Sequence, residues 1–114
     1  MTFDQYKKSV GGHKPDNLLS QLLQALWWDA KGQWDQAHNI TQEIHSNEAA
    51  AVHAYLHRKE EDIGNASYWY RSAGRPGFKG TLEQEWKSLV RDLLNSEWTI
   101  PPAYLTNLYP FTFY

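Results

Sequence analysis

The chain has 114 residues, no cysteine, and 13 acidic against 11 basic side chains, which gives a formal net charge of -2. An apolar fraction of 41% with six tryptophans and seven tyrosines indicates a folded chain, and surface scaling lets roughly two-thirds of its surface be buried in one domain. The lack of cysteine excludes disulfides and thiolate metal sites and favours a cytoplasmic location. A pI near 6.2 argues against nucleic-acid binding. Apolar runs such as 26–28 are far shorter than the roughly 20 residues of a membrane span, and the first residues lack the apolar stretch of a signal peptide, so neither is expected.

Residues 1–15 are polar, contain two adjacent glycines and end at Lys14-Pro15, so they are predicted to form an N-terminal arm. A single helical domain should then occupy residues 16–97. Its first helix is predicted to start with Asp16 as N-cap and to stop at Gly32. Between them apolar residues recur at intervals of three and four, which is typical of a helix in a packed bundle: Leu18, Leu19, Leu22, Leu23, Leu26, Trp27 and Ala30.

Three more helices are predicted up to the glycine-rich turn at 74–77. The second helix should run from Gln33 to about His45, the third should be capped by Ser46 or Asn47, and the fourth by Asp62. The fourth helix should stop at Gly74, because glycine readily adopts the left-handed conformation that follows a helix and the nearby proline cannot continue one.

A fifth helix and an aromatic tail complete the chain. Thr81 is predicted to open the fifth helix in a capping box with Gln84, and the helix should extend to Glu97. Residues 98–114 contain three prolines among many aromatic side chains. We expect them to form an extended tail that packs on the domain or on a partner subunit in a homodimer.

The predicted helices carry an internal repeat. An offset of 29 residues lays the first two helices on the next two without a gap, pairing Ala25 with Ala54 and Ala37 with Ala66. The run 31–37, Lys-Gly-Gln-Trp-Asp-Gln-Ala, resembles tetratricopeptide repeats, and the run 65–73, Asn-Ala-Ser-Tyr-Trp-Tyr-Arg-Ser-Ala, is similar to Sel1-like repeats. The resemblance implies an all-α array of five helices, with two stacked antiparallel hairpins and a capping helix. Residues 53–60 also resemble small uncharacterised helical proteins of bacteria and fungi, which implies no activity.

Two histidines on the predicted third helix are candidates for metal binding. His53 and His57 are four residues apart, so both imidazoles project from one side of the helix, as in helical metal sites. The glutamate of the zinc-protease motif is absent between them, and the sequence fixes no third ligand, although His38 and His45 could join. The alternative is that these histidines form hydrogen bonds inside a helix interface or face the solvent.

The same region could hold a small anion. Arg71 and Arg75 could bind a carboxylate or phosphate while Tyr68 stacks on the apolar part of the ligand, with His53 and His57 beside them. The alternative is that these arginines are surface charges whose stems pack on aromatic rings.

No catalytic motif or phosphate-binding loop accompanies these residues. The sequence therefore favours a non-enzymatic module that binds a protein or a small anionic ligand, without a cofactor. The alternative is a metal- or anion-dependent binder or enzyme that uses His53 and His57, assisted by His38, Glu60 or Arg71.

Overall fold

The computed structural model describes residues 1–99, and the side chains of 97–99 are not described; the tail predicted from residue 100 onward lies outside the described residues. The described part is all-helical, as predicted, with no strand in it. The sequence predicted five helices, and the described part holds six. They are α1 (Phe3–Ser9), α2 (Gln21–Ala30), α3 (Trp34–Gln42), α4 (Asn47–Lys59), α5 (Ile63–Ala73) and α6 (Leu82–Thr99).

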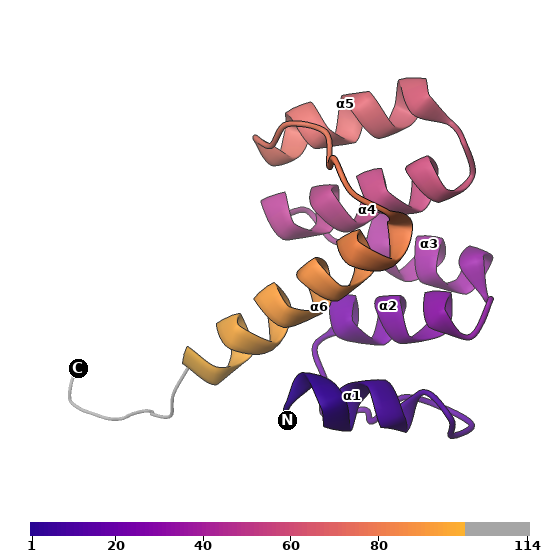
Figure 1. Ribbon diagram of the computed structural model, residues 1–114, viewed down its shortest axis with the longest axis vertical. Helices are drawn as coiled ribbons and strands as arrows, with labels where there is room; N and C mark the ends of the chain where they lie inside the picture. The colour runs from indigo at the N-terminus through magenta and orange to yellow at the C-terminus, as the bar shows by residue number, and fades with distance from the viewer. Residues whose placement is uncertain (100–114) are drawn as a thin grey trace.

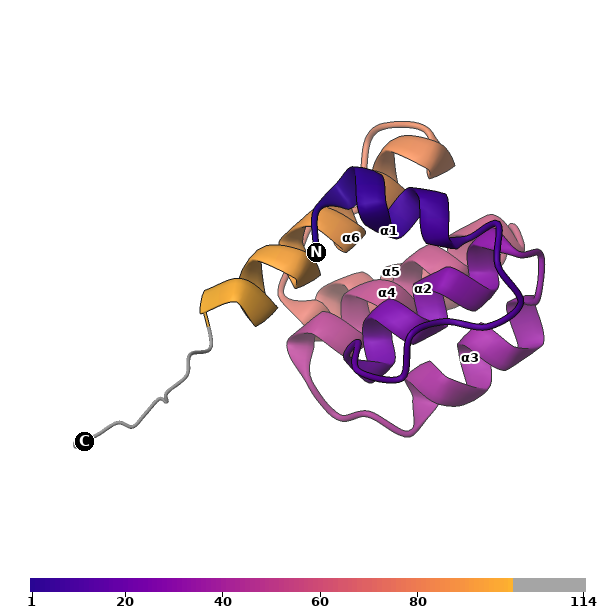
Figure 2. The same ribbon diagram turned by 90° about the horizontal axis from the view of Figure 1, so that it is seen from below.

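The helices α2 to α5 lie one on another in chain order, and α6 crosses the stack diagonally (Figure 1). Helix α6 contacts α2 and α4, and α1 packs against α6. Seen from below, α1 and α6 lie on one side of the stack and α3 on the opposite side (Figure 2). Helix α4 is therefore in the centre, with neighbours on several sides.

The sequence explains why α4 can occupy the centre. All residues from Ala49 to Leu56 are buried, and four of these eight are alanines, which allow neighbouring helices to approach closely. Further along α4, charged and polar side chains reach buried carboxylates on two other helices. Lys59 pairs with Asp29 of α2 at 2.9 Å, and Arg58 pairs with Glu85 of α6 at 2.7 Å. These pairs fix the position of α4 between α2 and α6.

Helix α1 lies within the stretch that the sequence predicted to be an arm. Thr2 and Gln5 form a capping box at its start, and the Tyr6 hydroxyl donates a 2.5 Å hydrogen bond to the carbonyl of Leu23. Phe3 meets Trp86 of α6 edge-on, with ring centroids 5.9 Å apart. Tertiary contacts of a few side chains therefore hold this short helix, which has no long apolar pattern of its own.

The first predicted helix begins later than the sequence indicated. Ser20 caps α2 by accepting a hydrogen bond from the backbone of Leu23. Asp16 instead closes a turn by accepting a hydrogen bond from the Leu18 backbone, and Leu18 is 88% exposed. The prediction of Asp16 as N-cap was wrong because an aspartate can bond its local backbone in a turn as readily as at a helix start.

Most of the other predicted helix ends agree closely with the structure, although α3 ends at Gln42 and not near His45. Ser46 caps α4 and Asp62 caps α5, each through a hydrogen bond from the backbone three residues on. Gly74 ends α5 with a φ of 72°, and Thr81 forms the predicted capping box with Gln84. No helix in the described part combines the length and the apolar character needed to cross a membrane.

Candidate metal centre

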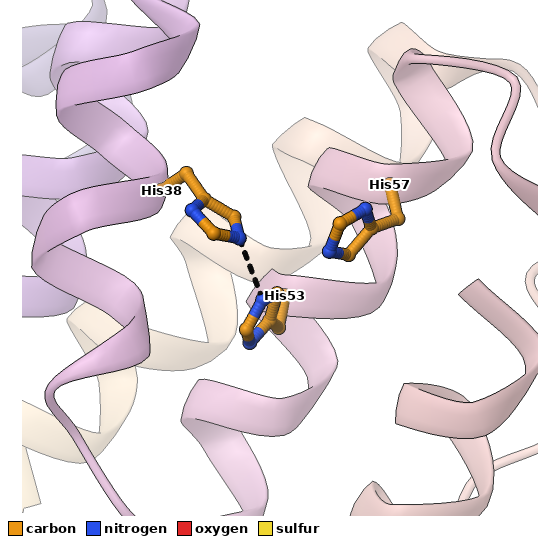
Figure 3. A group of neighbouring side chains, drawn as sticks. All are labelled: His38, His53 and His57. Carbon is orange, nitrogen blue, oxygen red and sulfur yellow. Dashed lines mark hydrogen bonds between the residues drawn. The ribbon is translucent and has the colours of Figure 1, made fainter. Parts of the chain in front are cut away.

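Three histidines from two helices converge between α3 and α4. His38 comes from α3, and His53 and His57 come from successive turns of α4 (Figure 3). Each residue offers a potential ligand atom, and these three atoms all lie within 4.8 Å of one another. The Nε2 atoms of His38 and His53 are 2.9 Å apart and share a hydrogen bond. The group thus joins the predicted pair on α4 with a third imidazole that is distant in sequence.

Local sequence explains how each ring reaches the group. Residues four apart on a helix project from the same side, so His53 and His57 stack with their centroids 5.0 Å apart. On α3, Trp34 is four residues before His38 and stacks on it at 4.9 Å with an interplanar angle of 12°. The Trp34 indole also donates a 2.8 Å hydrogen bond to the Leu56 carbonyl of α4. Trp34 therefore orients His38 toward α4.

A second tryptophan covers the group from α5. Trp69 stacks on His53 with a centroid distance of 4.0 Å and an interplanar angle of 13°. His53 is only 7% exposed, whereas His38 and His57 are half-buried. The three imidazoles thus lie between two indoles, which restrict both ring rotation and access of water.

The surroundings favour neutral imidazoles. Burial lowers the pKa of His53 to about 4, and the neighbouring His38 and His57 act in the same direction. Burial also lowers the pKa of His38, with His57 contributing in the same direction and Asp35 opposing it. A neutral imidazole has a lone pair on one ring nitrogen, which is the form that binds metals.

His57 has a carboxylate neighbour at its far side. The Asp62 carboxylate is 3.7 Å from His57 Nδ1, while a ring nitrogen of His57 points toward the other two histidines (Figure 3). Hydrogen bonds from Asn65 hold the pKa of Asp62 below its usual value, so this carboxylate stays charged. A carboxylate on the outer nitrogen of a histidine is a common means of fixing the orientation of a metal ligand.

The spacing of the three nitrogens suits a metal ion after small side-chain rotations. Zinc–nitrogen bonds of about 2.0–2.1 Å in a tetrahedral site place the ligand atoms about 3.4 Å apart. The 2.9 Å pair must open by about 0.5 Å, and separations of up to 4.8 Å must shorten by up to about 1.4 Å. Both changes require rotations about the side-chain bonds of the histidines.

A cleft of about 300 Å³ lies against His53 on the side of the α4 N-terminus. It is bounded by the end of α3, the start of α4 and the side of α5. Its walls hold four polar side chains, Gln42, Ser46, Asn47 and Ser72, and three aromatic rings, His45, His53 and Trp69. None of the residues that line it carries a carboxylate.

The other residues that the sequence analysis singled out lie apart from the histidine group. Tyr68 and Arg71 are exposed on α5, and Tyr68 contacts Trp69 edge-on at 5.1 Å. Arg75 follows α5 and lines a separate cleft with Glu48 and Asp92. His45 is exposed beyond the end of α3 and lines the cleft beside His53.

Sequence reasoning considered Ser46 only as a helix cap and did not connect Trp69 or Ser72 with a site. The i to i+4 spacing of Trp34 and His38 was a usable signal for an oriented imidazole. The contribution of Trp69, by contrast, depends on how α5 docks on α4.

Comparison of the chain with protein-family models, with curated proteins and with solved structures finds no match in any of the three. The resemblance to tetratricopeptide and Sel1-like repeats therefore rests on the residues quoted above alone.

Proposed function

We propose that the protein binds one divalent transition-metal ion through His38, His53 and His57. The observation that supports this proposal is the convergence of three potential imidazole ligand atoms within 4.8 Å of one another. The two flanking indoles and the lowered pKa values of His38 and His53 support it further, because they favour fixed, neutral ligands.

The chemistry of the ligands selects the class of metal. Imidazole nitrogen suits zinc, copper, nickel and iron, whereas magnesium and calcium require oxygen ligands. Three protein ligands leave a fourth position of a tetrahedral site for water or an external ligand, the arrangement found in catalytic zinc sites. The proposal is a metal-binding function with an open position and assigns no reaction.

The proposal is tested by metal content and affinity. Protein without a histidine tag should bind one zinc ion per chain in isothermal titration calorimetry, and elemental analysis of dialysed protein should give the same ratio. His38→Gln and His57→Gln should each weaken zinc binding at least tenfold by removing one ligand.

His13→Gln is the matched control, since His13 is exposed and lies outside the group. Absence of stoichiometric zinc binding, or equal losses in His13→Gln and His38→Gln, would overturn the proposal and leave the histidines as packing residues. Cobalt in place of zinc should give the intense visible bands of a tetrahedral site.

We also propose that α2 with α3, and α4 with α5, are the two helix hairpins of a tetratricopeptide-like or Sel1-like stack. The burial of both Ala37 and Ala66, which the 29-residue offset pairs, supports this arrangement. The metal ligands would then come from both hairpins, with His38 on the first and His53 and His57 on the second. In this arrangement the two stacked hairpins bring together ligands that are distant in the sequence.

A further inference from the structure

His53 faces two environments at once. Its Nε2 points to His38, and Figure 3 shows its other ring nitrogen, Nδ1, directed away from both other histidines. The residue also lines the cleft of about 300 Å³ at the start of α4. Although His53 is only 7% exposed, no hydrogen bond to its Nδ1 is formed within the described residues. A buried polar nitrogen without a protein partner indicates a place for an external group.

The tautomer of His53 determines what that nitrogen can bind. In the metal-free protein, either Nε2 of the His38–His53 pair can carry the shared proton, so Nδ1 of His53 can be an acceptor or a donor. A metal ion bound to Nε2 requires the lone pair there, so the remaining proton of the neutral ring must reside on Nδ1. Metal binding thus fixes Nδ1 of His53 as a hydrogen-bond donor.

The rest of the cleft is suited to an acceptor with negative charge. The first N–H groups of a helix lack partners within it and carry a partial positive charge, and Ser46 and Asn47 at the start of α4 line the cleft. Ser46 already accepts a hydrogen bond from the Ala49 backbone and is therefore committed to capping, which leaves Gln42, His45, Asn47 and Ser72 to complete the polar wall. No carboxylate on the wall would repel an anion.

From these observations we propose that the cleft binds the carboxylate group of a small molecule, and that the metal at the three histidines strengthens this binding through the Nδ1–H of His53. The inference deepens the proposed function and rests on it. The volume is at the lower end of ligand pockets and fits a short-chain carboxylate. Trp69 provides an apolar surface for the chain of such a ligand.

The coupling must act in both directions. If the metal raises the affinity for the carboxylate by some factor, the carboxylate raises the affinity for the metal by the same factor. The ligand would hydrogen-bond to the outer nitrogen of a metal-binding histidine, a position from which polar groups commonly tune metal affinity by about 10-fold to 100-fold.

The test uses the full chain with and without zinc and two probes of nearly equal shape, propionate and the neutral propionamide. Nuclear magnetic resonance titration should show saturable shifts at the amides of Asn47 and Ala49 and at the indole of Trp69. With zinc, propionate should bind at least tenfold more tightly than without it, and propionamide should bind weakly in both states. Zinc affinity measured in saturating propionate should rise by the same factor.

A charge variant tests the location. Asn47→Asp places a carboxylate on the cleft wall, where it should weaken propionate binding at least fivefold by repulsion. The fold should persist, because an acidic residue in the first turn is favourable to a helix. Asn17→Asp adds the same charge in an exposed loop outside the cleft and should leave propionate binding unchanged.

The outcomes separate the two proposals. If zinc binds at the three histidines but propionate does not bind, or binds equally with and without zinc, the carboxylate proposal is overturned while the metal function stands. If propionate changes the visible spectrum of the cobalt form and Asn47→Asp has no effect, the carboxylate ligates the metal directly, and the cleft assignment is wrong. If zinc does not bind, the proposed metal-binding function is wrong, and the carboxylate proposal that rests on it is overturned as well.

Discussion

Burial of His53 between Trp69 and His38 gives the metal-free protein a specific sensitivity to acid. The pKa of His53 is about 4 in the folded protein against 6.5 for an ordinary histidine. Below pH 6.5 the unfolded chain therefore binds a proton that the folded protein does not. The free energy of unfolding falls as the pH drops from 6.5 toward 4, and this residue accounts for up to about 3 kcal/mol of the loss.

The measurement is urea unfolding of metal-free protein at pH values between about 4 and 7.5, which span this titration. His53→Gln lacks a titratable ring and should flatten this part of the profile, because the unfolded state then gains no extra proton at position 53. His13→Gln changes an exposed histidine and should reproduce the wild-type slope. A His53→Gln profile parallel to that of the wild type would show that other groups cause the acid sensitivity.

Individual residues of the site were predictable to different extents. The spacing of His53 and His57 was sufficient to predict that they share a helix side, because this depends only on helical geometry. The approach of His38 depends on the turn between α3 and α4, and the cover by Trp69 depends on how α5 packs, so neither followed from local pattern. The cleft beside His53 is formed by three helices together, which no single segment encodes.

Helix ends show the same distinction between local and tertiary causes. The caps Ser46, Asp62 and Thr81 were predicted correctly because each satisfies backbone groups within its own first turn. Helix α1 was missed because two of the side chains that hold it, Phe3 and Tyr6, contact partners on α6 and α2. Its capping box between Thr2 and Gln5 was the one local signal available.

Two glycines of α5 provide a paired test of its termini. Gly74 has a φ of 72° at the C-cap, so Gly74→Ala should destabilise the protein by about 1 kcal/mol. Gly64 lies inside the first turn, where a β-carbon would meet no atom within 4 Å apart from its chain neighbours and the nearby backbone of its own helix. Gly64→Ala should stabilise the protein by about 0.5 kcal/mol because alanine favours the helix. Chemical denaturation measures both changes. Equal effects of the two substitutions would contradict the assigned helix end.

At the scale of the whole molecule, a metal bound by the three histidines would add a direct link between α3 and α4, which are otherwise joined by packing and by hydrogen bonds such as that from the Trp34 indole to the Leu56 carbonyl. His38 lies on α3 and the other two ligands lie on α4, so a bound metal holds these helices together directly. Any ligand that binds only the folded state stabilises it by mass action, by about 2.7 kcal/mol at a free concentration one hundred times the dissociation constant.

We therefore expect zinc to raise the midpoint of thermal unfolding in proportion to the logarithm of its free concentration. The shift at a given zinc concentration should be much smaller in His38→Gln, which removes the ligand from α3, and should persist in full in His13→Gln. Circular dichroism at the helix band measures the midpoint. A zinc-dependent shift that is undiminished in His38→Gln would indicate metal binding elsewhere on the protein.

The ligand group consists of imidazoles alone, and the chain has no cysteine anywhere. Many structural zinc sites depend on thiolates, which peroxide converts to sulfenic acids and disulfides with loss of the metal. Imidazole ligands undergo no such reaction under the same mild conditions. Exposure to hydrogen peroxide at concentrations that empty thiolate zinc sites should leave this metal in place, so that the site would remain occupied during oxidative stress.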